Sequence, residues 1–457
     1  MDYAAIYIAH SRAERVAFMN GNLHCSGRPR GSVLIVTLIV CVALVSLTLV
    51  MGHSMMMAYR GSDNELAGRQ ADIAIEGAAQ YAEALMTNVD QPGAMPDPDN
   101  YQSEAVPLGE ATFWFIGEPE PSATANTPAF GLVDEASKLN LNTATATMLE
   151  NLPGMTDDLA EAIVAWRKSS SASPSPGEAA SSSSSEAKSA PFESVEELAQ
   201  VNGGTDLLTL FGNDTNLNHV LDPSESAAGA TQFSPGLLEY VTVFSRIPNT
   251  LSNGTKRINV TQTGGPLTGM LNTAFGTARG GQITTTLRRA GTVKSVLEFY
   301  NKSGMTPTEF AVISGSLTMT TGTFSSGLIN VNTASATVLE CVPGITANTA
   351  AQIISTRAGQ PEPVTNLSWV APILGPTVST QAGPYLTAET YQVSADVAAV
   401  GHYGRGYRRT LFVIDNSFGT PQIVYRRNLA SLGWALGSAE RQALAQQDGT
   451  PKQKGTP

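Results

Sequence analysis

An uncharged apolar run near the N-terminus constrains the fold of this chain more than any other feature. Residues 33–51, VLIVTLIVCVALVSLTLVM, carry no charged side chain. A helix rises about 1.5 Å per residue, so a run of this length spans roughly 28 Å, the thickness of a bilayer core. Apolar residues continue at helical spacing beyond the run: Leu66, Ile73, Ala74, Gly77, Ala78, Tyr81 and Leu85. We therefore predict one long helix over 32–90, half of it in lipid and half packed against a folded domain.

The residues that flank the run predict how it crosses the membrane. The run is too long for the apolar part of a cleaved secretory signal, and no A-x-A site follows it. Four arginines precede it: Arg12, Arg15, Arg28 and Arg30. Because the cytoplasmic flank of a membrane helix is rich in Lys and Arg, we expect a single-pass anchor. Its N-terminus would lie in the cytoplasm and the bulk of the chain on the other side.

A second feature is an internal repeat. Residues 139–167 and 329–357 share 14 identities in 29 positions without a gap, and their first halves read LNLNTATATMLENLPGM and INVNTASATVLECVPGI. Two short helices joined by a tight Pro-Gly turn are typical of a helix-hairpin-helix. The expected turn residues are Pro153, Gly154, Pro343 and Gly344. A degenerate further copy is expected at 257–289, which lacks the Pro-Gly pair.

Charge argues against the best-known use of such hairpins, which is to hold DNA phosphates. Phosphate binding needs backbone N–H groups at the turn and nearby cations. The first hairpin carries only Arg167 against its acidic residues Glu150, Asp157, Asp158 and Glu161, and the whole chain has a formal charge of −12. Counterion release supplies most non-specific affinity, so we expect no nucleic-acid partner and a structural hairpin. The alternative is a membrane-tethered DNA receptor, which pairs an N-terminal anchor with such hairpins.

A polar stretch between the repeats has the spacing of a calcium loop. Residues 214–225 read DTNLNHVLDPSE. Positions 1, 3, 5, 7, 9 and 12 of an EF-hand-like loop would be Asp214, Asn216, Asn218, the carbonyl of Val220, Asp222 and Glu225. The misfit is His219, which stands where glycine normally makes the sharp turn. We predict a Ca²⁺ site here, with a polar surface turn as the alternative.

The remaining pattern completes an α+β fold, in which the long helix packs on an antiparallel sheet with a large inserted all-α domain of helix-hairpin-helix (SAM-like) repeats. Strand alternation is expected at 111–117, at 390–416 and at 421–434. We divide the chain into a leader (1–31), the long helix (32–90), first strands and loops (91–138), a first helical unit (139–245) with a serine-rich insertion (169–190), a degenerate second unit (246–327), a last unit (328–385), closing strands (386–436) and a disordered tail (437–457).

No residue pattern predicts an enzyme. The five histidines are scattered, and no metalloprotease, nucleophile-elbow or P-loop spacing occurs. Three cysteines exclude a disulfide framework, and Cys341, within an apolar helical pattern, is expected to be a buried structural thiol.

The N-terminal third resembles type IV pilins and pseudopilins, in which one long helix is half in the membrane and half packed on a domain. In that family a prepilin peptidase cuts after a glycine and methylates the new N-terminus, which implies a cut between Gly31 and Ser32. Most members carry glutamate at mature position five, where this chain has Val36. Together with DEASKLNLNTA at 134–144, this absence resembles the K-class minor pseudopilins of type II secretion.

The resemblance implies a structural role at the tip of a secretion pseudopilus. The implied location is the bacterial inner membrane, with the bulk of the chain periplasmic. Expected partners are the other minor pseudopilins (I and J classes), prepilin peptidase, inner-membrane lipid, secreted substrates and the outer-membrane secretin. Calcium binding in the helical domain is also a family property. The chain departs from the family in its serine-rich insertion and in roughly 70 extra residues between 257 and 327.

Overall fold

A computed structural model describes residues 32–119, 127–168, 188–226, 229, 232–262, 264–360 and 364–447. The predicted leader with Gly31, residues 169–187 of the serine-rich insertion and residues 448–457 lie outside this set. The chain forms two units, one up to Ser62 and one from Asp63 onward, and each is described by itself.

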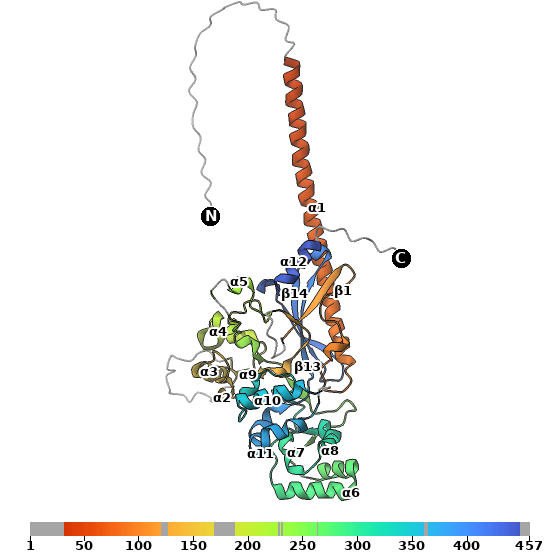
Figure 1. Ribbon diagram of the computed structural model, residues 1–457, viewed down its shortest axis with the longest axis vertical. Helices are drawn as coiled ribbons and strands as arrows, with labels where there is room; N and C mark the ends of the chain where they lie inside the picture. The colour runs from red at the N-terminus through yellow and green to blue at the C-terminus, as the bar shows by residue number, and fades with distance from the viewer. Residues whose placement is uncertain are drawn as a thin grey trace, which may run out of the picture. The chain divides into compact units, whose positions relative to one another are not determined.

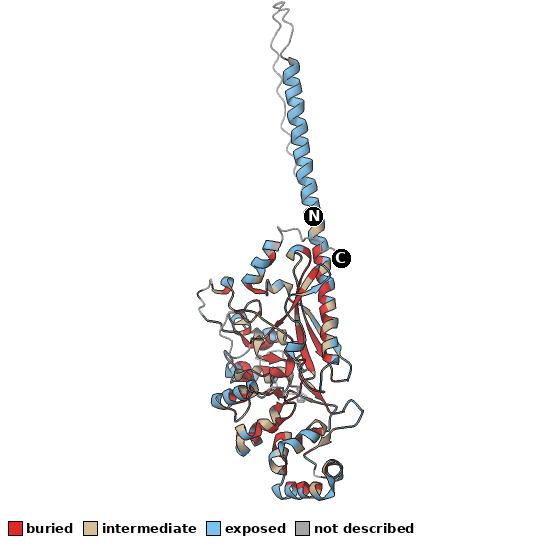
Figure 2. Ribbon diagram, turned by 45° about the vertical axis from the view of Figure 1, so that its right-hand side comes forward, coloured by how far each residue is buried: buried red, intermediate tan, exposed pale blue. Residues whose placement is uncertain are grey.

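Helix α1 (Ser32–Thr87) runs through the whole apolar segment, as predicted. It is the one helix among the described residues that is long and apolar enough to cross a membrane. Its apolar side chains up to Met57, Val36 among them, are exposed, so nothing in the described protein covers them (Figure 2). This part of α1 therefore has the surface of a membrane or helix-bundle segment, not of a soluble core.

The second unit is built on an antiparallel sheet whose main strand order is β1-β2-β13-β14-β15, with β3 beside β2 and β4 beside β13 (Figure 1). The end of α1 covers one face with a stripe of alanines that lets the helix approach closely, and Phe113, Phe115 and Phe412 fill the interface. The strand predicted at 111–117 is confirmed. The bounds are β1 Val106–Leu108, β2 Ala111–Gly117, β3 Ala129–Phe130, β4 Val133–Asp134, β13 Gln392–Val400, β14 Arg408–Asp415 and β15 Gln422–Asn428.

The helical domain is inserted between β4 and β13, and its first and last parts follow one element order. Each opens with a two-residue strand, continues through a hairpin of two helices and further helical turns, and closes with a second strand that pairs in parallel with the first. The first part contains β5 Leu139–Asn140, α2 Ala146–Leu149, α3 Asp157–Arg167, η3 Val195–Gly203, α4 Leu207–Phe211, α5 Pro223–Ser226, η4 Leu237–Glu239 and β6 Val241–Thr242. The last part contains β11 Ile329–Asn330, α9 Ala336–Glu340, α10 Ala347–Ala358, η6 Leu367–Trp369, α11 Ala371–Ala382, η7 Gly383–Tyr385 and β12 Leu386–Thr387.

The middle segment has the same order. Its strands β8 and β9 also pair in parallel, and in all three pairs an apolar-Asn strand faces an apolar-Thr strand. Gly276, at φ 79°, breaks α6 into two helices and so makes the turn that the Pro-Gly pair makes elsewhere. The elements are β8 Ile258–Asn259, α6 Gly265–Ala290, α7 Val296–Ser303, α8 Pro307–Ile313, η5 Ser314–Ser316 and β9 Leu317–Thr318. Strands β7 Arg246–Pro248 and β10 Phe324–Ser326, which flank these elements in the sequence, form a separate antiparallel pair.

The prediction of a disordered tail from residue 437 was wrong for its first part. Residues Gly437–Gln447 form helix α12, whose Leu444 is buried with Trp114 and Val400 on the other face of the sheet. The apolar pattern of residues 437–447 is too weak to predict a helix. The burial of Leu444 against the sheet is a contact between distant segments, which local composition does not indicate.

Candidate functional site

The two Pro-Gly turns have the geometry of structural hairpins. Gly154 and Gly344 adopt φ of 74° and 87°, a left-handed conformation that glycine takes without strain. A hydroxyl side chain caps the start of each helix by accepting a hydrogen bond from a backbone N–H group. The capping residues are Thr145 and Thr156 in the first hairpin and Ser335 and Thr346 in the last. The apolar positions behind the turns lie in one core: Leu149, Leu152, Ile163, Leu339, Val342 and Ile353.

The single arginine of each of these hairpins is used inside its own unit. Arg167 donates to the carbonyl oxygens of Leu141 and Ala144. Arg357 donates in the same way, 2.7 Å to Ala334 and 3.2 Å to Val331. These cations tie the second helix back to the strand that opens the unit, so they are not presented to an external phosphate. Exposed Asp157 and Asp158 stand in the first turn of α3, where an anion would otherwise be favoured.

The predicted calcium loop folds back on itself around Asp214. Its carboxylate accepts hydrogen bonds from the backbone N–H groups of Asn218 (3.1 Å) and His219 (2.9 Å). Asn218 Oδ1 accepts from the N–H of Val220 at 3.1 Å. His219 has φ 63°, the left-handed conformation that position 6 of the loop requires and that histidine adopts at some cost. The sequence misfit is therefore accommodated by a left-handed backbone at His219, and Leu217 of the same loop is also left-handed, at φ 55°.

The other expected ligands are hydrogen-bonded within the same loop. Glu225 accepts from the N–H groups of Thr215 (2.8 Å) and Asp222 (3.0 Å). The amide nitrogens of Asn216 and Asn218 donate to one carboxylate oxygen of Asp222, at 2.7 and 3.0 Å. Asn216 Oδ1 is buried and has no hydrogen-bond partner. The part of the chain that the structure describes holds no cluster of three or more His, Cys, Asp or Glu ligands, and this loop offers amide oxygens beside its carboxylates.

Burial makes the loop electrostatically unusual. Burial raises the pKa of Asp214 to about 6. Burial also opposes a charge on His219, but Glu239, 2.9 Å from its Nδ1, outweighs it and raises the pKa of His219 to about 9. A carboxylate whose ionisation is disfavoured is stabilised by a nearby cation, and the unpaired Asn216 oxygen is a further donor atom. The residues therefore fit a hard oxygen-ligated cation such as Ca²⁺.

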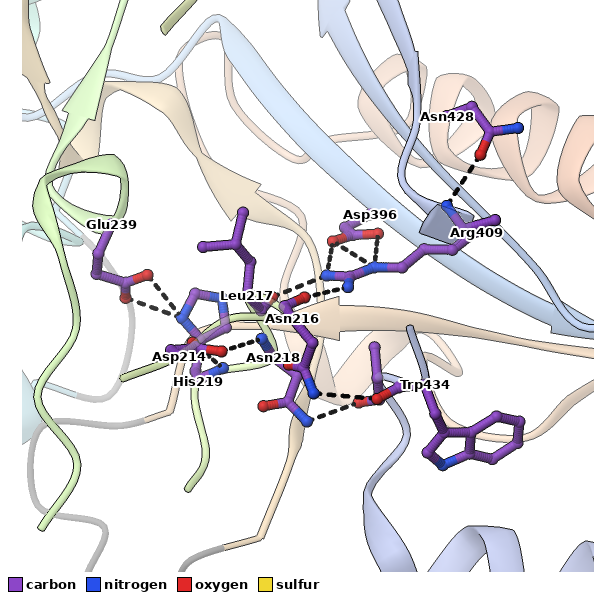
Figure 3. A network of polar contacts seen from close by, with 12 residues as sticks. Asp214, Asn216, Leu217, Asn218, His219, Glu239, Asp396, Arg409, Asn428 and Trp434 are labelled. Carbon is purple, nitrogen blue, oxygen red and sulfur yellow. Dashed lines mark hydrogen bonds and ion pairs between the residues drawn. The ribbon is translucent and has the colours of Figure 1, made fainter. Parts of the chain in front are cut away.

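Sequence reasoning missed the arginine that fixes this loop to the sheet. Arg409 of β14 is fully buried and donates to the backbone carbonyls of Asn216 and Leu217, the latter at 2.8 Å (Figure 3). Its neighbour Arg408 points to the opposite face of the sheet and pairs with Asp72 of α1 at 2.9 Å. Two adjacent arginines within an otherwise apolar strand were the available signal, since strand neighbours face opposite sides.

The remaining expected site residues lie apart from this loop. Ser32 begins α1, and Val36 lies in its uncovered apolar part. Cys341 is buried in the core of the last hairpin, and burial raises its pKa to about 12, as expected for a structural thiol.

The chain is similar to a known sequence motif and to a solved structure. Residues 134–173 match the helix-hairpin-helix motif. No curated protein matches the chain. A chain in the crystal structure of the GspK-GspI-GspJ complex of the enterotoxigenic Escherichia coli type 2 secretion system is similar to this chain at 10% identity and a TM-score of 0.30, covering 83% of this chain and 98% of that one. A TM-score of this size is too low for the two folds to superpose as a whole.

Proposed function

We propose that this chain is a structural, non-enzymatic minor pseudopilin of the K class. It would cap the tip of a type II secretion pseudopilus and support export of folded periplasmic proteins across the outer membrane. The observation that carries the proposal is α1 (Ser32–Thr87), one helix that is apolar and uncovered in its first half and buried on an antiparallel sheet in its second. Single-pass anchoring in the bacterial inner membrane, with the bulk of the chain periplasmic, follows from this plan.

Processing of the leader is the first test. Prepilin peptidase would cut between Gly31 and Ser32, and the new N-terminus would be methylated. Co-expression with the peptidase followed by mass spectrometry should give a chain that starts at N-methylated Ser32. Gly31→Leu is the control that should remain uncut. An uncut native chain contradicts the assignment.

The position in the filament is the second test. Val36 replaces the glutamate whose carboxylate would pair with a neighbouring subunit, and a carboxylate is costly in lipid unless it is paired. A subunit without that contact, and with a large head, suits the end of a filament. We expect co-purification with I- and J-class minor pseudopilins and immunogold label at filament ends, where substrates and the secretin are met. Label along the shafts contradicts tip capping.

We also propose that the loop 214–225 holds Ca²⁺ through Asp214, Asn216, Asn218, Asp222, Glu225 and the carbonyl of Val220. Bound calcium would add positive charge beside Asp214 and would stiffen the loop against the sheet. Calorimetric titration of the full-length chain should give calcium heat that Asp214→Ala and Glu225→Ala abolish. Glu161→Ala, an exposed carboxylate of α3 outside the loop, should leave it intact. Unchanged binding in the two loop variants rules the site out.

The motif match favours one alternative, a membrane-anchored helix-hairpin-helix receptor for DNA uptake. The acidic first hairpin and the internally bonded Arg167 and Arg357 weigh against it. A gel shift at low salt with duplex DNA distinguishes the two. Tight, salt-sensitive binding favours the receptor.

A further inference from the structure

Charge is distributed unevenly among the three helical units. Residues 139–245 contain 14 Asp and Glu against 3 Lys and Arg, a formal charge of −11. Residues 246–327 contain 8 Lys and Arg against 2 Asp and Glu, a formal charge of +6 within a chain of −12. Residues 328–385 are close to neutral, at −1. The middle unit is therefore a basic island on an acidic protein.

Both acidic side chains of the middle unit are occupied within it. Glu309 pairs with Arg279 at 2.7 Å, and Glu298 pairs with Lys302 at 2.7 Å. Arg257 and Arg246 pair outward, with Glu389 of the closing segment at 2.8 Å and with Asp415 of β14. These pairs hold the unit together and fix it to its neighbours, so they do not form its free surface.

Four cations of the middle unit take part in no ion pair that the structure describes: three lie at the turn between α6 and α7, and the fourth, exposed Lys256, lies before β8. Arg288 and Arg289 are exposed in the last turn of α6, and exposed Lys294 follows. The structure describes no ion pair for these three side chains. Lys302 lies beside them, because its Nζ donates 2.6 Å to the carbonyl of Thr292, but its charge is paired with Glu298. We call Arg288, Arg289 and Lys294 the basic patch. Helices α6, α7 and α8 lie together at one end of the folded unit, with α6 outermost (Figure 1).

We propose that the basic patch is a docking surface for an acidic protein segment, rich in Asp and Glu. Arg288 and Arg289 are favourable at the C-terminal end of α6, but Lys294 lies beyond that helix and its charge is not explained by the dipole of α6. Arginine forks bind carboxylates with two parallel hydrogen bonds, which gives such a patch geometric selectivity as well as charge. The proposal goes beyond the pseudopilin role and holds whether or not the chain caps a filament.

The acidic surroundings favour a protein segment over a nucleic acid or an anionic membrane. Charges interact strongly only within about 8 Å at physiological salt. A compact acidic segment bound at the patch would therefore interact with the patch and not with the acidic parts of the chain. A duplex or a lipid surface extends further, and the strongly acidic remainder of the chain opposes its approach. Arg279, next to the Gly276 turn where a hairpin would hold phosphate, is bound to Glu309 and is not available to one.

The test uses the full-length chain in nanodiscs of neutral phosphatidylcholine. Three labelled probes are titrated at low and at physiological salt: a glutamate-rich peptide, a duplex oligonucleotide and phosphatidylglycerol vesicles. The test variant is Arg288→Gln/Arg289→Gln. The control variant is Arg69→Gln/Lys168→Gln, which removes the same charge at exposed sites outside the middle unit. Thermal melting checks that both variants fold.

We expect salt-sensitive peptide binding that becomes roughly tenfold weaker in the test variant and is nearly unchanged in the control. Absence of peptide binding at low salt overturns the proposal. An equal loss in both variants assigns the binding to net charge and also overturns it. If the duplex or the vesicles bind as tightly as the peptide, with the same loss in the test variant, the partner is a phosphate polyanion instead.

Discussion

Arg409 of β14 and Asp396 of β13 form a buried ion pair that reaches from the sheet into the helical insertion. The guanidinium lies 3.0 and 2.6 Å from the two oxygens of Asp396, and its remaining N–H groups bond the carbonyls of Asn216 and Leu217. Because each of its three nitrogens donates a hydrogen bond, the charge is tolerated in the protein interior. The loop 214–225 thus takes its shape from a strand that follows it by almost two hundred residues.

Removing this arginine should be costly. Arg409→Gln leaves Asp396 buried without its cation and leaves two loop carbonyls unsatisfied, so we expect a loss of about 3–5 kcal/mol in unfolding free energy. Chemical denaturation of the full-length chain in mild detergent measures it. Arg426→Gln is the matched control, because Arg426 pairs with Glu76 and both side chains are about half exposed. That variant should lose less than about 1 kcal/mol. Equal losses would show that the Arg409 network is not structural.

The sequence predicted those parts of the fold that depend on a local periodic pattern of apolar residues. The apolar spacing from Leu66 to Leu85 predicted a helix against a domain, and the alternation at 111–117 predicted β2. The face was only partly right, because Leu66 and Ile73 are exposed and a row of alanines makes the contact. The two Pro-Gly hairpins were expected to be structural, and their apolar positions lie in one core. In each case the signal and the structure it reports lie within a few residues of one another.

The parts that sequence could not predict depend on contacts between distant segments. The tether from Arg409 to the loop 214–225 pairs a strand residue with loop carbonyls, and backbone acceptors cannot be recognised from the amino-acid sequence. Likewise, α12 is held by burial of Leu444 against the sheet. The middle unit was expected as a degenerate copy at 257–289, but the position of its turn was not predicted. That turn uses Phe275-Gly276 in place of Pro-Gly, and a lone glycine within a helical pattern indicates only a weak helix former.

The role of Gly276 can be tested against a glycine in the same helix. Gly276→Ala forces a side chain into φ 79°, so we expect a loss of about 1 kcal/mol although the space around it is open. Gly281→Ala sits in regular helix with nothing within 4 Å of the added methyl, so it should gain about 0.5–1 kcal/mol. Opposite shifts in melting temperature confirm a turn at Gly276. Shifts of the same sign contradict it.

Asp134 should give the protein a pH-dependent stability. It accepts hydrogen bonds from Thr333 (2.6 Å), Thr390 (2.7 Å) and Asn330 (2.8 Å), and burial nevertheless raises its pKa to about 6. The folded state therefore binds this proton more tightly than the unfolded state, whose pKa is near 3.8. The stability that protonation contributes is complete below pH 4 and is lost as the pH rises to about 6.

Asp134→Asn removes that proton equilibrium. We expect the melting temperature of the native chain to fall more steeply between pH 4 and pH 6 than that of the variant, and the two to run parallel above pH 6. The comparison of slopes separates Asp134 from other buried carboxylates, such as Glu135 and Glu389, which titrate in both proteins. Identical slopes would mean that Asp134 titrates at its ordinary pKa.

Cys341 can report whether the last hairpin stays closed. Its side chain is 1% exposed, its thiol donates to the carbonyl of Thr337 at 3.2 Å, and burial with the nearby charge of Glu340 raises its pKa to about 12. The reactive thiolate is then a very small fraction at neutral pH, and reagent has no access. With Cys25 and Cys41 replaced by serine, maleimide should leave the folded chain unmodified and label it fully in denaturant.

Gly344→Ala, which strains a turn at φ 87° and brings a methyl within 2.5 Å of Gln381, should speed labelling of Cys341 by opening the hairpin. Gly109→Ala, at φ 64° in the distant β1–β2 turn, carries similar strain and should not. Rapid labelling of the native chain would mean that the hairpin core is not closed around Cys341.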